Sequence, residues 1–292
     1  MLRPCSSGDD MQKLLQFLQN CRKINPHGDF EHIGDLLWAM RNPEADPMEN
    51  ACFLIERNAI AGFGMIEGTF LTFRTLPDST PDNDAALLQW AEKRARLSHP
   101  HDPLQTQVRE DNEERIRLLE QSGFKRSGNF FTAMERNTDL HGQEPVLPEG
   151  FSFMDGPGDD MLDEYVRMHR SAWGTGSTYS VEAHRRVTRL PGYAKELNPT
   201  VVSDGGRIAG SCICWPDKVN RIGEIEPLQV EPGYRRTGIA KAITLEAVFR
   251  MRLFGMEKAL VYNSGSNIPA GRLYASSGFN PQGTILVYEK NA

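Results

Sequence analysis

The most constraining feature of this chain is that its first half recurs, diverged, in its second half. The sequence Gly-Asp-Asp-Met occurs at 8–11 and again at 158–161, and Ile-Ala-Gly occurs at 60–62 and at 208–210. A longer match aligns residues 112–124 with 267–279, and the three matches follow the same order in both halves. Collinear matches at a nearly constant offset indicate a duplicated structural unit, and 292 residues suffice for two domains. The sequence therefore predicts two domains of similar topology.

The same order of secondary structure is predicted in each half. An Asp pair, expected to supply an N-cap, opens an amphipathic helix, and two strands around a turn follow it. A further strand, a long helix, another strand, a short helix ending at Gly123 or Gly278 and a closing strand complete the unit. The predicted helices cover 11–21, 84–97, 161–173 and 239–253; the predicted strands cover 51–56, 60–66, 104–108, 130–134, 200–203, 208–215, 259–262 and 285–289. We therefore expect an α+β fold with domains at 1–138 and 151–292, joined by a Pro- and Gly-containing linker at 139–150.

Composition limits the partners and the compartment. No apolar run approaches the roughly 18–20 residues that a membrane span needs, and the first residues lack the apolar core of a signal peptide. Five cysteines, an odd number, are typical of a reducing compartment, so a cytoplasmic protein is expected. The net charge of −6 gives no reason to expect nucleic-acid binding and slightly favours a cationic substrate.

The segment 230–240, Val-Glu-Pro-Gly-Tyr-Arg-Arg-Thr-Gly-Ile-Ala, predicts an anion-binding site. An apolar strand precedes it and a long amphipathic helix follows it, so several backbone N–H groups and the positive end of the helix dipole meet at one point. Gly238 lets a ligand approach the backbone closely. The corresponding stretch of the first half, 76–81, has no Arg pair and no glycine. Only the second half is therefore expected to bind a phosphate or pyrophosphate.

Two motifs of the second half resemble those of the GNAT superfamily of acyl-CoA-dependent N-acetyltransferases. Residues 235–240 fit that family's Arg/Gln-x-x-Gly-x-Gly/Ala pyrophosphate motif, and Asn267-x-x-Ala-x-x-Leu-Tyr-x-x-x-Gly-Phe lies about 30 residues downstream. The resemblance covers 151–290 by motif and 1–138 by topology. It implies two tandem domains, each with a mixed, mostly antiparallel sheet flanked by helices. It further implies that the second domain is catalytic and that the first is a degenerate, non-catalytic copy.

The resemblance also implies roles for individual residues. Acetyl-CoA would be the cosubstrate, held at its pyrophosphate by Arg235, Arg236, Thr237, Gly238, Ile239 and Ala240 and at its pantetheine arm by the strand residues Leu228, Gln229 and Val230. Asn267 would hydrogen-bond the pantetheine or cap its helix, and Tyr274 would protonate the leaving thiolate. Glu224 or Glu226 would deprotonate the amine, directly or through water, and the choice between them stays open. Pro227 in the same strand is expected to mark a bulge.

Three functions remain open at this point. The leading one is direct transfer of acetyl to a primary amine, with a small-molecule acceptor favoured and with a monomer or a homodimer expected. The others are a non-catalytic acyl-CoA-binding or sensing module and a peptide or protein acetyltransferase. No metal is expected, because Cys212 and Cys214 fit core packing and the His99–Asp102 cluster fits a solvated turn.

Overall fold

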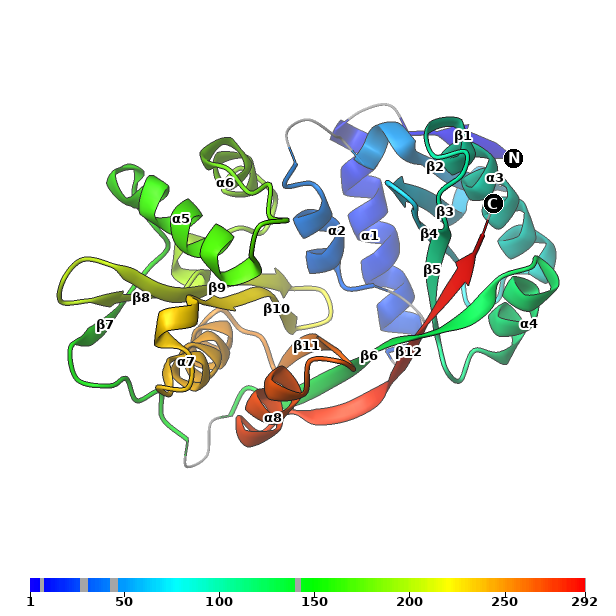
Figure 1. The fold of residues 1–292 in the computed structure, drawn as a ribbon. Helices are drawn as coiled ribbons and strands as arrows, with labels where there is room; N and C mark the ends of the chain where they lie inside the picture. Colours follow the sequence, from blue (N-terminus) through cyan, green and yellow to red (C-terminus); the bar gives the residue numbers. More distant parts are fainter. Residues whose placement is uncertain (6–7, 27–30, 43–46, 140–142, 292) are drawn as a thin grey trace.

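The structure is a computed structural model that describes residues 1–5, 8–26, 31–42, 47–139 and 143–291. Its described strands form one twelve-stranded sheet in the order β1-β2-β3-β4-β5-β12-β6-β11-β10-β9-β8-β7. Figure 1 shows this sheet running through both halves, with helices on both of its faces. The predicted α+β fold with a mixed sheet and flanking helices is confirmed.

Within the described residues, the first half contributes six strands and four helices. The strands are β1 (Leu2–Pro4), β2 (Ala51–Glu56), β3 (Ala59–Glu67), β4 (Phe70–Thr75) and β5 (Leu104–Arg109), followed by the long β6 (Lys125–Asn137). The helices are α1 (Gly8–Ile24), α2 (Ile33–Ala39), α3 (Pro81–Ser98) and α4 (Glu113–Gln121), with a 3-10 turn at Pro47–Asn50. Arg57 and Asn58 adopt positive φ angles of 48° and 64° in the β2–β3 turn, as a tight hairpin requires.

The second half repeats this plan. Its strands are β7 (Phe151–Met154), β8 (Thr200–Ser203), β9 (Ile208–Asp217), β10 (Ile222–Val230), β11 (Lys258–Ser264) and β12 (Asn280–Lys290). Its helices are α5 (Leu162–Trp173), α6 (Val181–Val187), α7 (Ile239–Leu253) and α8 (Ile268–Ser276), with 3-10 turns at Asp159–Met161, Lys195–Leu197 and Pro232–Tyr234. All predicted elements are present, and α2, α6 and the short strands β1 and β7 are additional.

One detail of the prediction is wrong: the Asp pairs do not cap the helices that follow them. Asp9 and Asp10 lie in the first turn of α1. In the second half, Asp159 and Asp160 form a 3-10 turn, and the N-cap of α5 is Met161, which has no side-chain capping bond. The acids instead complement the positive end of the helix dipole.

The two halves exchange their last strands. β12, the last strand of the second half, lies between β5 and β6, and β6 of the first half pairs with β11 through seven consecutive residues. Figure 1 shows β6 and β12 crossing between the halves as a pair. The last strand of each half therefore extends the sheet of the other half. The domain boundaries remain a prediction, with domains at 1–138 and 151–292.

Separate apolar cores lie on the two faces of the sheet. In the second half, α7 and α8 cover one face with a core that includes Ile243, Val248 and Tyr274. In the first half, α3 and α4 cover one face, and α1 and α2 pack on the other through Leu14, Phe17 and Leu36. α2 also contacts β9 and β10, so it touches the strand that carries the predicted site. No helix among the described residues is long and apolar enough to cross a membrane.

Candidate functional site

The loop between β10 and α7 has free backbone donors, as the sequence predicts. Arg236 and Gly238 adopt positive φ angles of 65° and 96°, and Gly238 is the N-cap of α7. The five backbone N–H groups from Arg236 to Ala240 donate no hydrogen bond to any described residue. A Cβ at Gly238 would meet no atom within 4 Å, so the loop is open above these donors. Such an arrangement suits a pyrophosphate.

Two side chains of this loop hydrogen-bond to backbone carbonyl oxygens, and a third is exposed. The Arg235 guanidinium donates to the carbonyl oxygens of Val230, at 3.1 Å, and Ala172, at 2.8 Å, and so it fixes the loop against the end of α5. Thr237 Oγ1 donates to the Tyr234 carbonyl at 2.7 Å. The exposed Arg236 side chain makes no ion pair with a described residue, which leaves it available to an anion.

β10 is bulged and parts from β11 just before this loop. Its pairing with β9 shifts register between Ile225 and Leu228, on either side of Pro227, which confirms the predicted bulge. Its parallel pairing with β11 covers only 222–224 against 258–260, within the described residues. Beyond Glu224 the edge of β10 that faces β11 therefore has backbone groups available to an extended ligand arm.

The three strand residues predicted to meet the pantetheine arm lie on this unpaired stretch. Leu228 is half-buried and Val230 belongs to the core beneath α7. The buried Gln229 side chain donates to Ser211 Oγ at 3.0 Å and accepts from the Trp173 indole at 3.0 Å. Only the backbone of Gln229 is therefore placed to contact a ligand in the gap.

The two candidate bases differ in environment. Glu224 is 1% exposed, and its Oε2 lies 3.0 Å from Nδ1 of His32 in the first half. Burial and the charge of Glu226 raise the pKa of Glu224 to about 8. Glu226 is half-buried and its carbonyl accepts from the Trp215 indole at 2.7 Å. Burial and the charge of Asp35 raise the pKa of Glu226 to about 8. Glu226 lines a cavity, and Glu224 is not among the residues that line it.

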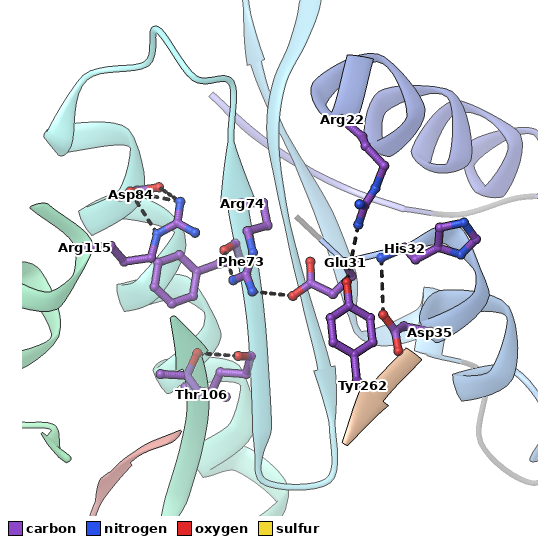
Figure 2. Close-up of polar contacts among 11 residues, drawn as sticks. Arg22, Glu31, His32, Asp35, Phe73, Arg74, Asp84, Thr106, Arg115 and Tyr262 are labelled. Carbon is purple, nitrogen blue, oxygen red and sulfur yellow. Dashed lines mark hydrogen bonds and ion pairs between the residues drawn. The ribbon is translucent and has the colours of Figure 1, made fainter. Parts of the chain in front are cut away.

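That cavity is a cleft of about 300 Å³ on the α1 and α2 side of the sheet. Its walls come from both halves and include Glu226, Leu260 and Tyr262 of the second. Figure 2 shows Arg22, Glu31, Asp35 and Tyr262 lying close together in this region. Arg22 Nη2 donates to the Tyr262 hydroxyl at 3.4 Å, and Arg74 forms an ion pair with Glu31. Acids outnumber bases in the lining, with Glu31, Asp35, Glu67, Glu135 and Glu226 against Arg22, Arg74 and Arg109.

Tyr274 lies on the other face of the sheet. It is 6% exposed on α8, and its ring packs edge-on against Phe279 with the centroids 5.8 Å apart. Burial, with the charge of Glu226 adding to it, raises the pKa of the Tyr274 phenol above its usual range. Asn267 is the N-cap of α8, and its side chain accepts from the Ala270 N–H at 3.2 Å. Asn112 caps α4 in the same way at 3.1 Å, so capping is the role that the repeat shares.

In the first half, an ion pair occupies the region that corresponds to the gap between β10 and β11. β4 also pairs with β5 through only two residues before the strands part. There Arg115 of α4 pairs with Asp84 of α3 at 3.0 Å, and its guanidinium lies 5.2 Å from the Phe73 ring centroid (Figure 2). Thr75 Oγ1 donates to Asp84 at 2.8 Å. The repeat aligns Arg115 with Ala270, so the second half has a small side chain where the first half has the arginine of this ion pair.

Sequence reasoning missed the residues that the first half contributes to the site. His32 and Asp35, at the start of α2, lie against β10, and no motif marks them. The His32-x-x-Asp35 spacing has the form of a capping box, which the structure contains, and it could have predicted where α2 begins. No group of three or more His, Cys, Asp or Glu side chains among the described residues is placed to hold a metal. Cys212 and Cys214 lie in the core.

The sequence of the second half is similar to that of known acetyltransferases. Residues 159–279 match the Acetyltransferase (GNAT) family. A mycothiol acetyltransferase of Saccharomonospora viridis is 25% identical over 195 residues, which cover 62% of this chain and 63% of that protein. A mycothiol acetyltransferase of Beutenbergia cavernae is 36% identical over 78 residues, covering 27% of this chain and 26% of its own length. The aligned regions thus span less than two thirds of these relatives.

Solved structures match the whole chain. A GCN5-related N-acetyltransferase from Sphaerobacter thermophilus has a TM-score of 0.73 at 18% identity, covering 100% of this chain and 95% of its own. A tandem GNAT protein from the clavulanic acid biosynthesis pathway has a TM-score of 0.73 at 15% identity, covering 100% and 98%. At such identities the likeness concerns the fold. The tandem layout is also similar to that of mycothiol synthase. Residues 159–279 therefore belong to the GNAT acetyltransferase family, and the chain as a whole has the tandem GNAT fold and is distantly homologous to the mycothiol acetyltransferases.

Proposed function

We propose that this protein transfers an acetyl group from acetyl-CoA to the primary amine of a small molecule by direct attack. One observation carries the proposal: Glu226 and Tyr274 lie on opposite sides of the point where β10 parts from β11. Glu226 lines the cleft beside α1 and α2, whereas Tyr274 belongs to the core beneath α7. A thioester in this gap would have a base on its acceptor side and an acid on its thiol side.

Each residue has a chemical reason for its role. Glu226 takes a proton from the acceptor ammonium, because an ammonium has no lone pair with which to attack the thioester carbon. Tyr274 gives its proton to the sulfur as the carbon–sulfur bond breaks, and its raised pKa keeps the phenol protonated until then. The free N–H groups of 236–240 and the unpaired edge of β10 hold and orient the cosubstrate, which supplies the activated acetyl group.

The cleft supports a small, cationic acceptor. Its lining has five acids and three arginines, so an ammonium bound there has carboxyl groups to pair with once they ionise, and α1 and α2 cover the cleft, which limits the size of the molecule that it admits. The relatives are named for acetylation of mycothiol, a small molecule, which agrees with this class. The first half is proposed to be non-catalytic, because it has the Arg115–Asp84 pair and Leu119 where the second half has the gap and Tyr274.

An amine panel tests the proposal. The full chain is incubated with acetyl-CoA and with amino sugars, aminoacyl compounds, arylalkylamines, polyamines or lysine peptides, and thiol release is measured together with product mass. We expect one small-amine class to gain a single acetyl group. Acetylation of peptides alone would point to a protein acetyltransferase. Tight acetyl-CoA binding without transfer to any amine would support a non-catalytic binding module instead.

A further inference from the structure

The N-terminus of α2, in the first half, is fastened to the catalytic strand of the second half. Its N-cap residue His32 is fully buried. His32 Nε2 lies 3.3 Å from the Ile222 carbonyl oxygen, and Nδ1 lies 3.0 Å from Glu224 Oε2. The Gly34 N–H donates to the same Nδ1 at 3.0 Å. One imidazole thus contacts β10 at two points, Ile222 and Glu224.

These contacts fix the protonation of both partners. A carbonyl oxygen only accepts, so Nε2 of His32 carries the hydrogen, and Nδ1 accepts from the Gly34 N–H. Glu224 then gains a hydrogen bond to Nδ1 only by donating its own carboxyl proton. Asp35 and Arg22 also face Glu224 and favour its ionised form, but burial and the charge of Glu226 outweigh them and raise the pKa of Glu224 to about 8. If His32 were an imidazolium beside an ionised Glu224, its Nδ1–H would face the Gly34 N–H, and two hydrogen-bond donors would point at each other. Burial and the charge of Arg22 lower the pKa of His32 to about 4, which agrees with a neutral ring.

The packing around this contact leads directly to Glu226. A Cβ on Gly34 would lie 2.2 Å from Glu224 Oε2 and 2.9 Å from Trp215, so only glycine lets α2 approach this closely. The indole of that tryptophan donates to the Glu226 carbonyl at 2.7 Å. Movement of α2 would therefore shift the bulge that carries Glu226.

We propose that His32 is a positioning residue of the acetyl transfer, by which the first half holds a neutral Glu224 and thereby sets the place of Glu226 at the gap. The expected effect of His32 on the rate of transfer rests on the proposed function. The two glutamates then have separate roles: Glu224 is a structural acid fixed by His32, and Glu226 is the group that meets the acceptor. Through His32, the first half would also affect the reaction that the second half catalyses.

Nitrogen NMR of the imidazoles tests the contact without any acceptor. In the full chain, we expect His32 to keep the neutral Nε2–H form from about pH 5.5 to about pH 8.5, a range in which an ordinary histidine titrates. Burial lowers the pKa of His169 to about 3 and that of His184 to about 4, so these two rings should also stay neutral and the His32 resonance must be identified among three. Loss of that resonance in His32→Asn assigns it. In Glu224→Gln, whose amide still donates to Nδ1, the ring should stay neutral. An imidazolium at His32 within this pH range would overturn the proposal.

Kinetics with an amine found in the panel test the consequence. We expect His32→Leu to lower kcat about tenfold or more while KM for acetyl-CoA changes less than about twofold. His32→Asn keeps an N-cap and an acceptor near the place of Nδ1, so kcat should recover to within about threefold of wild type. His101→Leu, the same change at an exposed histidine, is the matched control. Equal kcat values for His32→Leu and His101→Leu would overturn the proposal. If no amine is acetylated, the proposed function fails, and the NMR result alone decides the state of the contact.

Discussion

Gly238→Asp is the variant that tests the proposed pyrophosphate site most directly. Gly238 has φ 96° and open space around its missing Cβ, so an added side chain meets a backbone penalty of roughly 1–2 kcal/mol and no clash. Gly255, just beyond the other end of α7, has φ 84° and is equally open. Gly255→Asp therefore carries a similar backbone penalty and the same charge, far from the five free donors.

The expected loss of affinity follows from charge. The carboxylate of an Asp at 238 is taken to lie about 5 Å from each of the two charges of a bound pyrophosphate. At an effective dielectric constant of about 40, each pair repels by about 1.7 kcal/mol, or about 3 kcal/mol in total. Because each 1.4 kcal/mol is about tenfold in Kd, acetyl-CoA should bind roughly a hundredfold more weakly.

Isothermal titration with acetyl-CoA at about 0.15 M salt measures this change, with thermal unfolding of both variants as the control for strain. Gly255→Asp should bind like the wild type while losing a comparable amount of stability. If Gly238→Asp binds acetyl-CoA within about threefold of the wild type, the loop is not the pyrophosphate site.

Three further changes have defined outcomes. A base works only when it is deprotonated, and the pKa of Glu226 is raised to about 8. We therefore expect kcat/KM for the amine to rise with pH up to about pH 8 in the wild type. The pH–rate profile of Glu226→Gln should lack this rise. Asp84→Ala leaves its buried arginine partner without a carboxylate, so urea unfolding should show a loss of about 3–5 kcal/mol; a loss under about 0.5 kcal/mol would contradict the assigned burial. Gly34→Ala should lower the unfolding free energy by about 1–3 kcal/mol through its contact with Glu224, whereas Gly176→Ala, in open space, should be nearly neutral.

The repeat made most of the local structure predictable. Helix α7 and strands β2 and β8 begin and end where the apolar pattern and the turn residues place them. The bulge in β10 was foreseen from Pro227, because proline cannot continue a ladder of hydrogen bonds. These features depend on a few neighbouring residues, so the sequence is sufficient to reveal them.

The long-range features could not be predicted in the same way. β6 and β12 follow equivalent Gly-Phe turns and have similar patterns, so nothing local decides which half each strand joins. The contact between His32 and Glu224 joins residues 192 positions apart and arises only when α2 packs on β10. For the same reason, the sequence left the choice between the two glutamates open, because their difference lies in what the first half places beside each.

The most direct test of the central claim is the single-turnover rate at saturating acetyl-CoA and amine for the wild type, Glu226→Gln and Tyr274→Phe. Base and acid catalysis each contribute about 10²–10⁴-fold, so each variant should transfer acetyl at least about a hundredfold more slowly. The affinity for acetyl-CoA should stay within about threefold, since neither side chain belongs to the pyrophosphate loop. Undiminished transfer by either variant would contradict the assignment of the reaction to the gap between β10 and β11.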